Sequence, residues 1–342
     1  MKQLVSILIP AYNAGEWISD TLRSALAQTY PHLEIIVVDD GSKDDTLQLA
    51  RRFETNRVRV VTQKNQGAAA ARNAAHRLCT GDYIQWLDAD DLLSPNKIQK
   101  QIEAADQIGD KRTLFSSGWG SFLYRYYRTQ FVPTPLWCDL TSTEWLLRKM
   151  SQNLHMQTAT WLVSRELTEA AGPWNTSLLV DDDGEYFCRV LLASNGVRFV
   201  PDSRVYYRAS GTGSVSYIGN SSPKMEAQWQ SMQLHMNYLR SLEDSLHTRA
   251  ACITYMHNWQ SNFFPQRLDL IEAMQARAVE LGGSLPKPCL PRKYSWIGSL
   301  FGQPTARRAQ IFLPYLKWSF LRFYDKLLFR IAHGESAPLR IR

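Results

Sequence analysis

The chain has 342 residues, of which 44% are hydrophobic and 21% charged, a balance that places it among globular proteins. Its five cysteines are widely separated and contain no CxxC pair, which excludes a disulfide scaffold and a zinc site built on cysteine pairs. The net charge of +7 belongs to the tail, because residues 286–342 hold eleven Lys or Arg and two acids. A basic tail on a mildly acidic body indicates an anionic surface as the partner of the tail.

The chain opens with a strand, a helix and a second strand. Residues 4–9 are a continuous apolar run that Pro10 ends, as is typical of a strand buried on both faces. Apolar residues then recur at helical spacing over 18–26, and residues 34–38 form a second run. This order implies parallel strands joined by a right-handed crossover. The first run is too short for a signal peptide, and no stretch reaches the roughly 18 to 20 apolar residues of a membrane span, so we expect a cytoplasmic protein.

The second and third strands lead toward one edge of the predicted sheet. The second strand runs into Asp39 and Asp40, so two acids fall at its carboxyl end. Ser42, with Asp45 three residues later, is expected to cap the helix that follows. Residues 58–61 form the third predicted strand. Because ligands of open α/β sheets bind at the carboxyl ends of the strands, this edge is the expected site.

The fourth predicted strand ends in a cluster of acids. Gly67 opens an alanine-rich helix from which Arg72 projects, and the next strand is predicted over 83–87. Three acids follow it: Asp88, Asp90 and Asp91. Taken alone they fit an exposed acidic turn at least as well, but oxygen ligands two residues apart, without His or Cys, suit Mg²⁺ or Mn²⁺ carrying phosphates. No G-x-G-x-x-G or G-x-x-x-x-G-K-[ST] loop is present, so metal and side chains are expected to hold the phosphates.

Four segments stand in a specific order and spacing in the first part of the chain. They are SILIPAYNAGEW, EIIVVDDGSKDDT, NQGAAAARNAA and GDYIQWLDADD. Together they resemble the family 2 inverting glycosyltransferases of the GT-A fold. The resemblance implies an α/β protein with a Rossmann-like, mixed but mostly parallel sheet flanked by helices.

A second block resembles the family segment that ends in an acidic pair and, some residues later, an arginine. It reads ATWLVSRELTEAAGPWNTSLLVDDDGEYFCRVL. With Arg189 set on the family arginine, Asp182 and Asp183 take the place of the Glu-Asp pair that carries the catalytic base. A shift of one residue would select Asp181 and Asp182 instead. The following VPDSRVYYRASGTGSVS then resembles the last strand and a loop that closes over the donor.

The resemblance implies a role for each matching residue. Asp90 would bind the Mg²⁺ or Mn²⁺ that bridges the donor diphosphate, and Asp183, or else Asp182, would be the general base. The residues implied for the donor nucleotide are Pro10, Tyr12, Asp39, Asp40, Arg72 and Asp88. The residues placed on the acceptor side are Trp174 and Glu185, although Trp174 fits a core aromatic equally well. Glu185 and His155 are the next bases to test.

The chain is divided into a catalytic part over 1–218, a helical extension over 219–285, and a Pro-rich linker with a basic tail over 286–342. Beyond Pro314, apolar side chains line one side of a predicted helix: Leu316, Phe320, Phe323, Tyr324, Leu327 and Ile331. Another side carries Arg322, Lys326 and Arg330. Such a helix suits an anionic membrane surface, contacted through 314–331. The alternative is that it packs on the catalytic part.

We therefore expect an inverting transferase that moves a sugar from a nucleotide-diphospho-sugar, most simply a UDP-sugar, to a hydroxyl of a surface glycan or a lipid-linked oligosaccharide. Its partners would be the donor, the acceptor and the inner face of the plasma membrane, but no nucleic acid. The alternative is a catalytically inactive module that binds a sugar nucleotide or a glycan on the same fold. A nucleotidyltransferase is disfavoured because no Gly-rich, Lys-containing loop follows the first strand.

Overall fold

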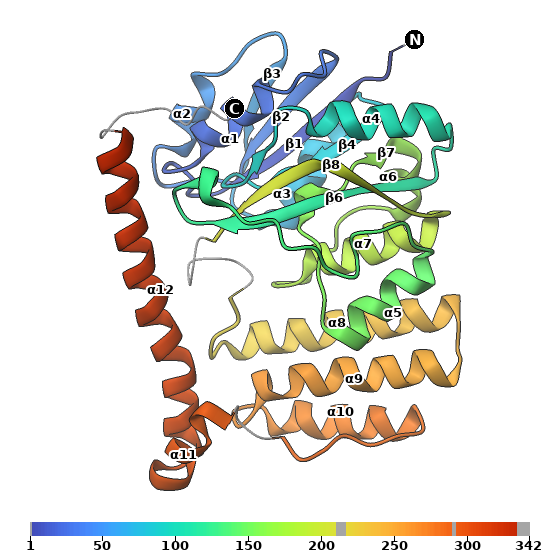
Figure 1. Ribbon diagram of the computed structural model, residues 1–342, viewed down its shortest axis with the longest axis vertical. Helices are drawn as coiled ribbons and strands as arrows, with labels where there is room; N and C mark the ends of the chain where they lie inside the picture. Colours follow the sequence, from blue (N-terminus) through green and yellow to red (C-terminus); the bar gives the residue numbers. More distant parts are fainter. Residues whose placement is uncertain (1, 210–216, 289–291, 334–342) are drawn as a thin grey trace.

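The computed structural model describes residues 2–209, 217–288 and 292–333, which form two sheets flanked by helices (Figure 1). The first sheet has the order β3-β2-β1-β4-β7 and contains β1 (Val5–Ala11), β2 (Leu33–Asp39), β3 (Val58–Thr62), β4 (Tyr83–Trp86) and β7 (Val163–Ser164). Strands β1 to β4 are parallel, and β7 is antiparallel to β4. The second sheet has the order β5-β8-β6, with β5 (Leu92–Leu93), β6 (Thr113–Phe122) and β8 (Gly196–Arg208). The mixed, mostly parallel architecture expected from the sequence is confirmed.

Helices cover both faces of the first sheet. They are α1 (Ile18–Leu26), α2 (Thr46–Arg51), α3 (Ala68–Leu78), α4 (Lys97–Ile108), α5 (Ser142–Gln152), α6 (Arg165–Ala171) and α7 (Asp182–Ala193), with 3-10 turns at Tyr126–Arg128 and Thr158–Thr160. The prediction that Ser42 and Asp45 cap α2 is wrong. The Ser42 hydroxyl accepts from the Asn13 amide at 3.0 Å, and the Asp44 carboxylate instead accepts from the Thr46 amide at 3.0 Å.

The continuous apolar runs of the sequence correspond to strands buried on both faces. All seven residues of β1 are buried. In β2, Ile36 and Val38 belong to the hydrophobic cluster on the α3 side, whereas Ile35 and Val37 belong to the cluster on the side of α1 and α4. Each such side chain contributes about 1.5–3 kcal/mol on burial, so the strands form a firm platform for the residues at their ends.

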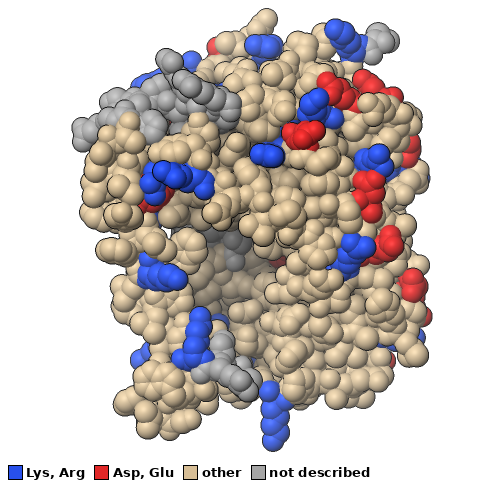
Figure 2. All heavy atoms as spheres, viewed as in Figure 1, with Lys and Arg blue, Asp and Glu red and all other residues tan. Residues whose placement is uncertain are grey.

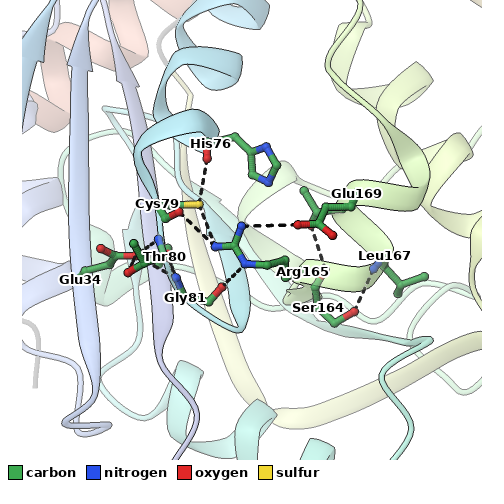
Figure 3. Close-up of polar contacts among 11 residues, drawn as sticks. Glu34, His76, Cys79, Thr80, Gly81, Ser164, Arg165, Leu167 and Glu169 are labelled. Carbon is green, nitrogen blue, oxygen red and sulfur yellow. Dashed lines mark hydrogen bonds and ion pairs between the residues drawn. The ribbon is translucent and has the colours of Figure 1, made fainter.

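The turn that leads into β4 is fixed at the end opposite the acids (Figure 3). Glu34 of β2 accepts hydrogen bonds from the amides of Thr80 at 2.6 Å and Gly81 at 3.0 Å. Arg165, at the start of α6, donates to the carbonyl oxygen of Gly81 at 2.9 Å. A Cβ at position 81 would come close to Ser6 Oγ and clash, so glycine is required there. These contacts set where β4 begins and hence where its carboxyl end delivers the acids.

Three helices form a layer below the sheets in the view of Figure 1: α8 (Ser222–Leu242), α9 (Leu246–Phe263) and α10 (Leu268–Glu280). They occupy the segment expected to be helical. Helix α8 packs on α7, and α9 packs on α5. Met232 of α8 and Tyr255 of α9 belong to the same buried cluster as Trp86 of β4 and Tyr186 of α7. The layer therefore shares its core with the first sheet.

Helices α11 (Arg292–Phe301) and α12 (Gln303–His333) follow, and α12 runs as a long rod along one side of the molecule (Figure 1, red). The helix begins before Pro314 and continues through it, so the start expected beyond Pro314 is placed too late. A proline removes one backbone hydrogen bond but does not by itself end a helix that has turns on both sides. The part of the chain described by the structure holds no helix long and apolar enough to cross a membrane.

The last third of α12 contacts the body of the protein. Asp325 accepts a hydrogen bond from Nε of Arg125 at 2.6 Å. Lys326 Nζ lies 2.6 Å from a carboxylate oxygen of Glu16, and Arg322 lies 3.6 Å from the same carboxylate. Two of the three basic residues predicted to face a membrane thus pair within the protein, as the packing alternative expected.

Candidate active site

The carboxyl ends of β1, β2 and β4 meet at one edge of the first sheet. Ala11, the last residue of β1, is in register with Asp39, the last residue of β2. Leu8 of β1 is in register with Trp86, the last residue of β4. The acids that follow β2 and β4 therefore converge, as the sequence predicted.

Arg72 lies at the centre of this edge and joins two acidic segments. Its Nη2 donates to Asp88 at 2.8 Å and its Nη1 donates to Asp182 at 2.8 Å. Burial acts to lower the pKa of Arg72, but Asp88 and Asp182 raise it overall, so the guanidinium stays charged. Arg72 of α3 thus ties the loop after β4 to the start of α7.

The indole ring of Trp174 packs against the guanidinium of Arg72. The guanidinium carbon lies 4.3 Å from the centroid of the Trp174 ring, a cation–π contact. The other face of Trp174 stacks on Tyr186, with centroids 4.0 Å apart and planes at 7°. Only 2% of Trp174 is exposed, which matches the alternative of a core aromatic, and its place on the acceptor side stays a prediction.

The start of α7 is anchored to the helical layer by Asp181. This residue has a left-handed backbone, with φ of 58°. Its carboxylate accepts from Ser231 Oγ at 2.7 Å and from Gln228 Nε2 at 3.0 Å, both on α8. Gly184 leaves room for this arrangement, because a Cβ there would overlap the Asp181 carboxylate. The Asp181 carboxylate is thus occupied by hydrogen bonds to α8. This disfavours the alternative alignment, in which Asp181 and Asp182 would take the place of the family's acidic pair.

Asp182 and Asp183 follow in the first turn of α7, in different surroundings. Asp182 is buried against Arg72. Burial raises the pKa of Asp182 to about 6, with Arg72 opposing the rise and Asp183 adding to it. Asp183 is half-buried, and its carboxylate accepts from Thr158 Oγ1 at 3.1 Å and from the Gly184 amide at 2.9 Å. Asp183 is therefore the more accessible of the two.

Glu185, one turn further, points into the protein. Its carboxylate accepts from Nε of Arg189 at 2.7 Å and from the Tyr238 hydroxyl at 2.7 Å. It is 2% exposed. Its oxygens are held by residues of α7 and α8, so its predicted place on the acceptor side stays a prediction that this burial does not favour.

The predicted nucleotide-binding residues lie at the same edge. Pro10 is buried in β1, whereas Tyr12 is 46% exposed. Asp39 accepts from Thr62 Oγ1 at 2.9 Å. Asp40 accepts from the Gly67 amide at 2.8 Å, which orders the loop before α3. Both acids are almost fully buried, so they shape the edge, and their direct contact with a nucleotide stays a prediction.

Arg208, at the end of β8, is a site residue that the sequence analysis did not single out. Its amide donates to Asp91 at 2.8 Å and its Nε donates to the carbonyl oxygen of Asp90 at 2.8 Å. Its guanidinium carbon lies 4.2 Å from the Trp17 ring. The sequence signal that could have pointed to Arg208 was the YYR segment of the last strand. This segment resembled the family but implied no role for any one of its residues. The two hydrogen bonds of Arg208 therefore fix the position of the loop that carries Asp90 and Asp91.

Tyr207 and Trp119 also border the acidic loop. Burial raises the pKa of Tyr207, and the charges of the acids after β4 raise it further, so its phenol stays protonated beside them. The Tyr207 ring meets Trp119 edge to face, 5.9 Å between centroids, and Trp119 lies 5.1 Å from His155. Burial lowers the pKa of His155, so this alternative base is held neutral. The loop that resembled a lid over the donor falls on residues 210–216, outside the described residues.

The acids after β4 fit a metal that reaches the site together with its substrate. Within the described ranges, no group of three or more His, Cys, Asp or Glu could hold an ion by itself. Magnesium usually takes one or two carboxylates and completes its shell with phosphate oxygens and water. Asp88 and Asp90 are half-buried at the edge, whereas Asp91 is fully buried with one oxygen that has no hydrogen-bond partner. Asp88 and Asp90 are therefore the residues that could hold such an ion, and their role as metal ligands stays a prediction.

The chain is similar in sequence to several glycosyltransferases. The chain is 29% identical over 256 residues to the UDP-Glc:alpha-D-GlcNAc-diphosphoundecaprenol beta-1,3-glucosyltransferase WfaP of Escherichia coli, which covers 74% of this chain and 92% of that protein. It is 49% identical over 98 residues to a chondroitin synthase of Escherichia coli, which covers 28% of this chain and 14% of that protein. For several relatives, the chain spans only between 14% and 42% of their length.

The fold is also similar to a solved structure. S. aureus TarS in complex with UDP-GlcNAc superposes with a TM-score of 0.66 at 18% identity, over 81% of both chains. The model of glycosyl transferase family 2 matches residues 6–168, which carry strands β1 to β4, Arg72 and the acidic loop. This segment, which is just under half of the chain, is similar to glycosyl transferase family 2.

Proposed function

We propose that this protein is an inverting glycosyltransferase that transfers a sugar from a UDP-sugar to an acceptor hydroxyl, assisted by Mg²⁺ or Mn²⁺. The observation that carries the proposal is the double ion pair of Arg72, which joins Asp88 of the donor motif to Asp182 beside the proposed base. The names of two similar proteins support a UDP-sugar donor: one uses UDP-Glc, and TarS was solved with UDP-GlcNAc. The donor and acceptor sides are thus held as one unit.

The donor would lie across the edge formed by β1, β2 and β4. Tyr12 offers an exposed ring on which the nucleobase can pack. Asp90, and the oxygen of Asp88 that does not contact Arg72, would hold the divalent ion. The ion, when bound, offsets the negative charge that grows on the leaving diphosphate. Arg208 fixes the loop that carries both acids.

Asp183 is the proposed general base. In a single displacement, a carboxylate takes the proton of the acceptor hydroxyl as its oxygen attacks the anomeric carbon. Asp183 is half-buried, and its carboxylate accepts hydrogen bonds from Thr158 and from the Gly184 amide but forms no ion pair with a basic residue among the described residues. An acceptor reaching Asp182 would have to break the contact with Arg72, which favours a positioning role for Asp182.

We further propose that the acceptor is a surface glycan or a lipid-linked oligosaccharide, reached at the inner face of the plasma membrane. Support comes from the aromatic face of α11 and α12. Large side chains that are exposed there include Trp296, Phe301, Phe312, Trp318, Phe320 and Phe323. An apolar surface of this extent marks a site of interaction, and aromatic side chains suit a membrane interface. Because Arg322 and Lys326 pair with Glu16, the contact would be mainly apolar.

Hydrolysis of UDP-sugars tests the reaction and separates it from a binding module. With Mn²⁺ and without acceptor, we expect slow release of UDP. Proton NMR should show that the freed sugar first appears as the anomer opposite to that of the donor, because water attacks from the far side. A protein that binds UDP-sugars and never releases UDP would be an inactive module. Release with the donor's own anomeric configuration would contradict inversion.

A further inference from the structure

An apolar pocket of about 480 Å³ lies between α12 and the carboxyl end of α9. This volume falls within the roughly 300–1,000 Å³ of ligand sites. Figure 2 shows the surface hollowed between α12 and the rest of the molecule. The side chains that give the pocket its apolar character are Tyr217, Ile218, Trp259, Ile311, Tyr315 and Trp318.

Arg307 of α12 supplies a buried positive charge to this pocket. It is 4% exposed, and its guanidinium donates to the carbonyl oxygen of Asn262 at 2.8 Å and to Gln310 Oε1 at 2.9 Å. The guanidinium also donates to the carbonyl oxygens of Ser261 at 3.3 Å and Gly219 at 3.4 Å, whereas its Nε has no hydrogen-bond partner among the described residues. A buried cation paired only with neutral oxygens is poorly compensated, so an anionic group would be favoured beside it.

The residues that line the pocket come both from α12 and from the segment just after β8. Tyr315 and Trp318 line it and also belong to the exposed face of α12. Ala209 also lines it, one residue after Arg208, whose amide donates to Asp91 of the acidic loop. A hydrocarbon chain in the pocket would therefore lie between the aromatic side chains of α12 and the segment that follows β8.

We propose that this pocket binds the hydrocarbon chain of a lipid phosphate, with the phosphate beside Arg307, and that this lipid anchors the acceptor. The apolar walls account for the chain, and the uncompensated guanidinium accounts for the phosphate. The anchoring of the acceptor rests on the proposed function, whereas the binding of the lipid phosphate does not.

Calorimetry on the full chain with farnesyl phosphate, farnesol and inorganic phosphate tests this site. Farnesyl phosphate is expected to bind at least about tenfold more tightly than either farnesol or phosphate, because only it uses both features. Arg307→Gln should weaken its binding about tenfold or more. Arg308→Gln removes the same charge from an exposed neighbour on the same helix and should leave the affinity unchanged.

A second pair of variants covers the case in which Arg307→Gln does not fold. Trp318→Ala should weaken farnesyl phosphate, whereas Phe320→Ala, which alters an exposed ring outside the pocket, should not. Equal affinity for farnesyl phosphate in wild type, Arg307→Gln and Trp318→Ala would overturn the proposal, as would equal binding of phosphate and farnesyl phosphate. UDP binding measured on the same samples shows separately whether the donor site is present.

Discussion

Asp182 and Asp183 are neighbours in sequence that the fold treats differently. Asp182 is buried and bound to Arg72, which also binds Asp88. Asp183 is half-buried and accepts a hydrogen bond from Thr158. The physical distinction is between a buried carboxylate paired with Arg72 and a more accessible one, which is why we propose Asp183 as the base.

Asp183→Asn is predicted to lower turnover roughly 10² to 10⁴-fold while leaving the affinity for UDP-sugar unchanged, because a base acts on the acceptor and does not need to touch the donor. Asp182→Asn should instead weaken donor binding, since Arg72 loses one of its two carboxylates. Steady-state kinetics and calorimetry on both variants separate these roles. Near wild-type turnover in Asp183→Asn would remove Asp183 as the base.

The raised pKa of Asp182 predicts how stability depends on pH. Burial raises this pKa from 3.8 to about 6, so the folded state binds the proton more tightly than the unfolded state. The resulting stabilisation is present at pH 4 and is lost as the pH rises through 6. The free energy of unfolding of the wild type, relative to that of Asp182→Asn, should therefore fall by up to about 3 kcal/mol between pH 4 and pH 7. Urea unfolding of both proteins at several pH values measures this difference in the free energy of unfolding. A difference that stays constant or rises between pH 4 and pH 7 would contradict the raised pKa of Asp182.

The position of a site residue could be predicted from the sequence where it belongs to a motif. It could not be predicted where it depends on packing between distant elements. Asp88 lies at the sheet edge where the strand-end argument expected it, and Arg72, which the family resemblance implied, pairs with it there. Trp174 could not be assigned, because its place under Arg72 depends on stacking with Tyr186. Arg208 was missed because only the register of β8 with β5 and β6 brings it under the acidic loop.

At the scale of elements, helix α8 sets the start of α7. Ser231 and Gln228 hold the Asp181 carboxylate, directly before the two candidate bases. Replacing both, as Ser231→Ala with Gln228→Leu, is predicted to lower turnover about tenfold or more with little change in donor KM, because misplacement by about 1 Å costs orders of magnitude in rate. Ser241→Ala, an exposed serine of the same helix, is the matched control. Unchanged turnover in the double variant would show that α8 does not position the base.

Helix α12 presents an apolar face whose partner can be tested by sedimentation. The double variant Phe320→Asp, Phe323→Asp should lose binding to vesicles that contain anionic lipid, because both rings are largely exposed. The double variant Leu246→Asp, Val279→Asp adds the same charge at exposed sites on α9 and α10 and should keep binding. If the Phe variant sediments as well as the control, α12 is not the membrane contact.

Elements with buried strands were easier to predict than the tail. Residues 4–9 and 34–38 read as continuous apolar runs because β1 and β2 are covered on both faces. The sequence of the tail predicted the amphipathic pattern of α12, but it did not predict which residues of the rest of the protein this helix contacts. Contacts such as Lys326 with Glu16 join residues more than 300 positions apart, which no local pattern can reveal.

At the scale of the whole molecule, one hydrophobic cluster runs from the first sheet through α7 into the helical layer. The donor edge, the proposed base and the lipid pocket thus lie on parts that contact one another. This arrangement agrees with a protein that binds its donor on one side and its acceptor beside α12. The central claim is that a UDP-sugar binds at the edge of the first sheet through a metal held by Asp90.

Calorimetric titration of UDP, with and without Mn²⁺, on the wild type and on Asp90→Ala tests that claim most directly. In the wild type, Mn²⁺ should increase the affinity for UDP about tenfold or more, since an ion held by Asp90 would offset the negative charge of the diphosphate. In Asp90→Ala that gain should disappear, while the weaker, metal-free affinity remains. An equal gain from Mn²⁺ in both proteins, or no binding of UDP to the wild type, would contradict the account.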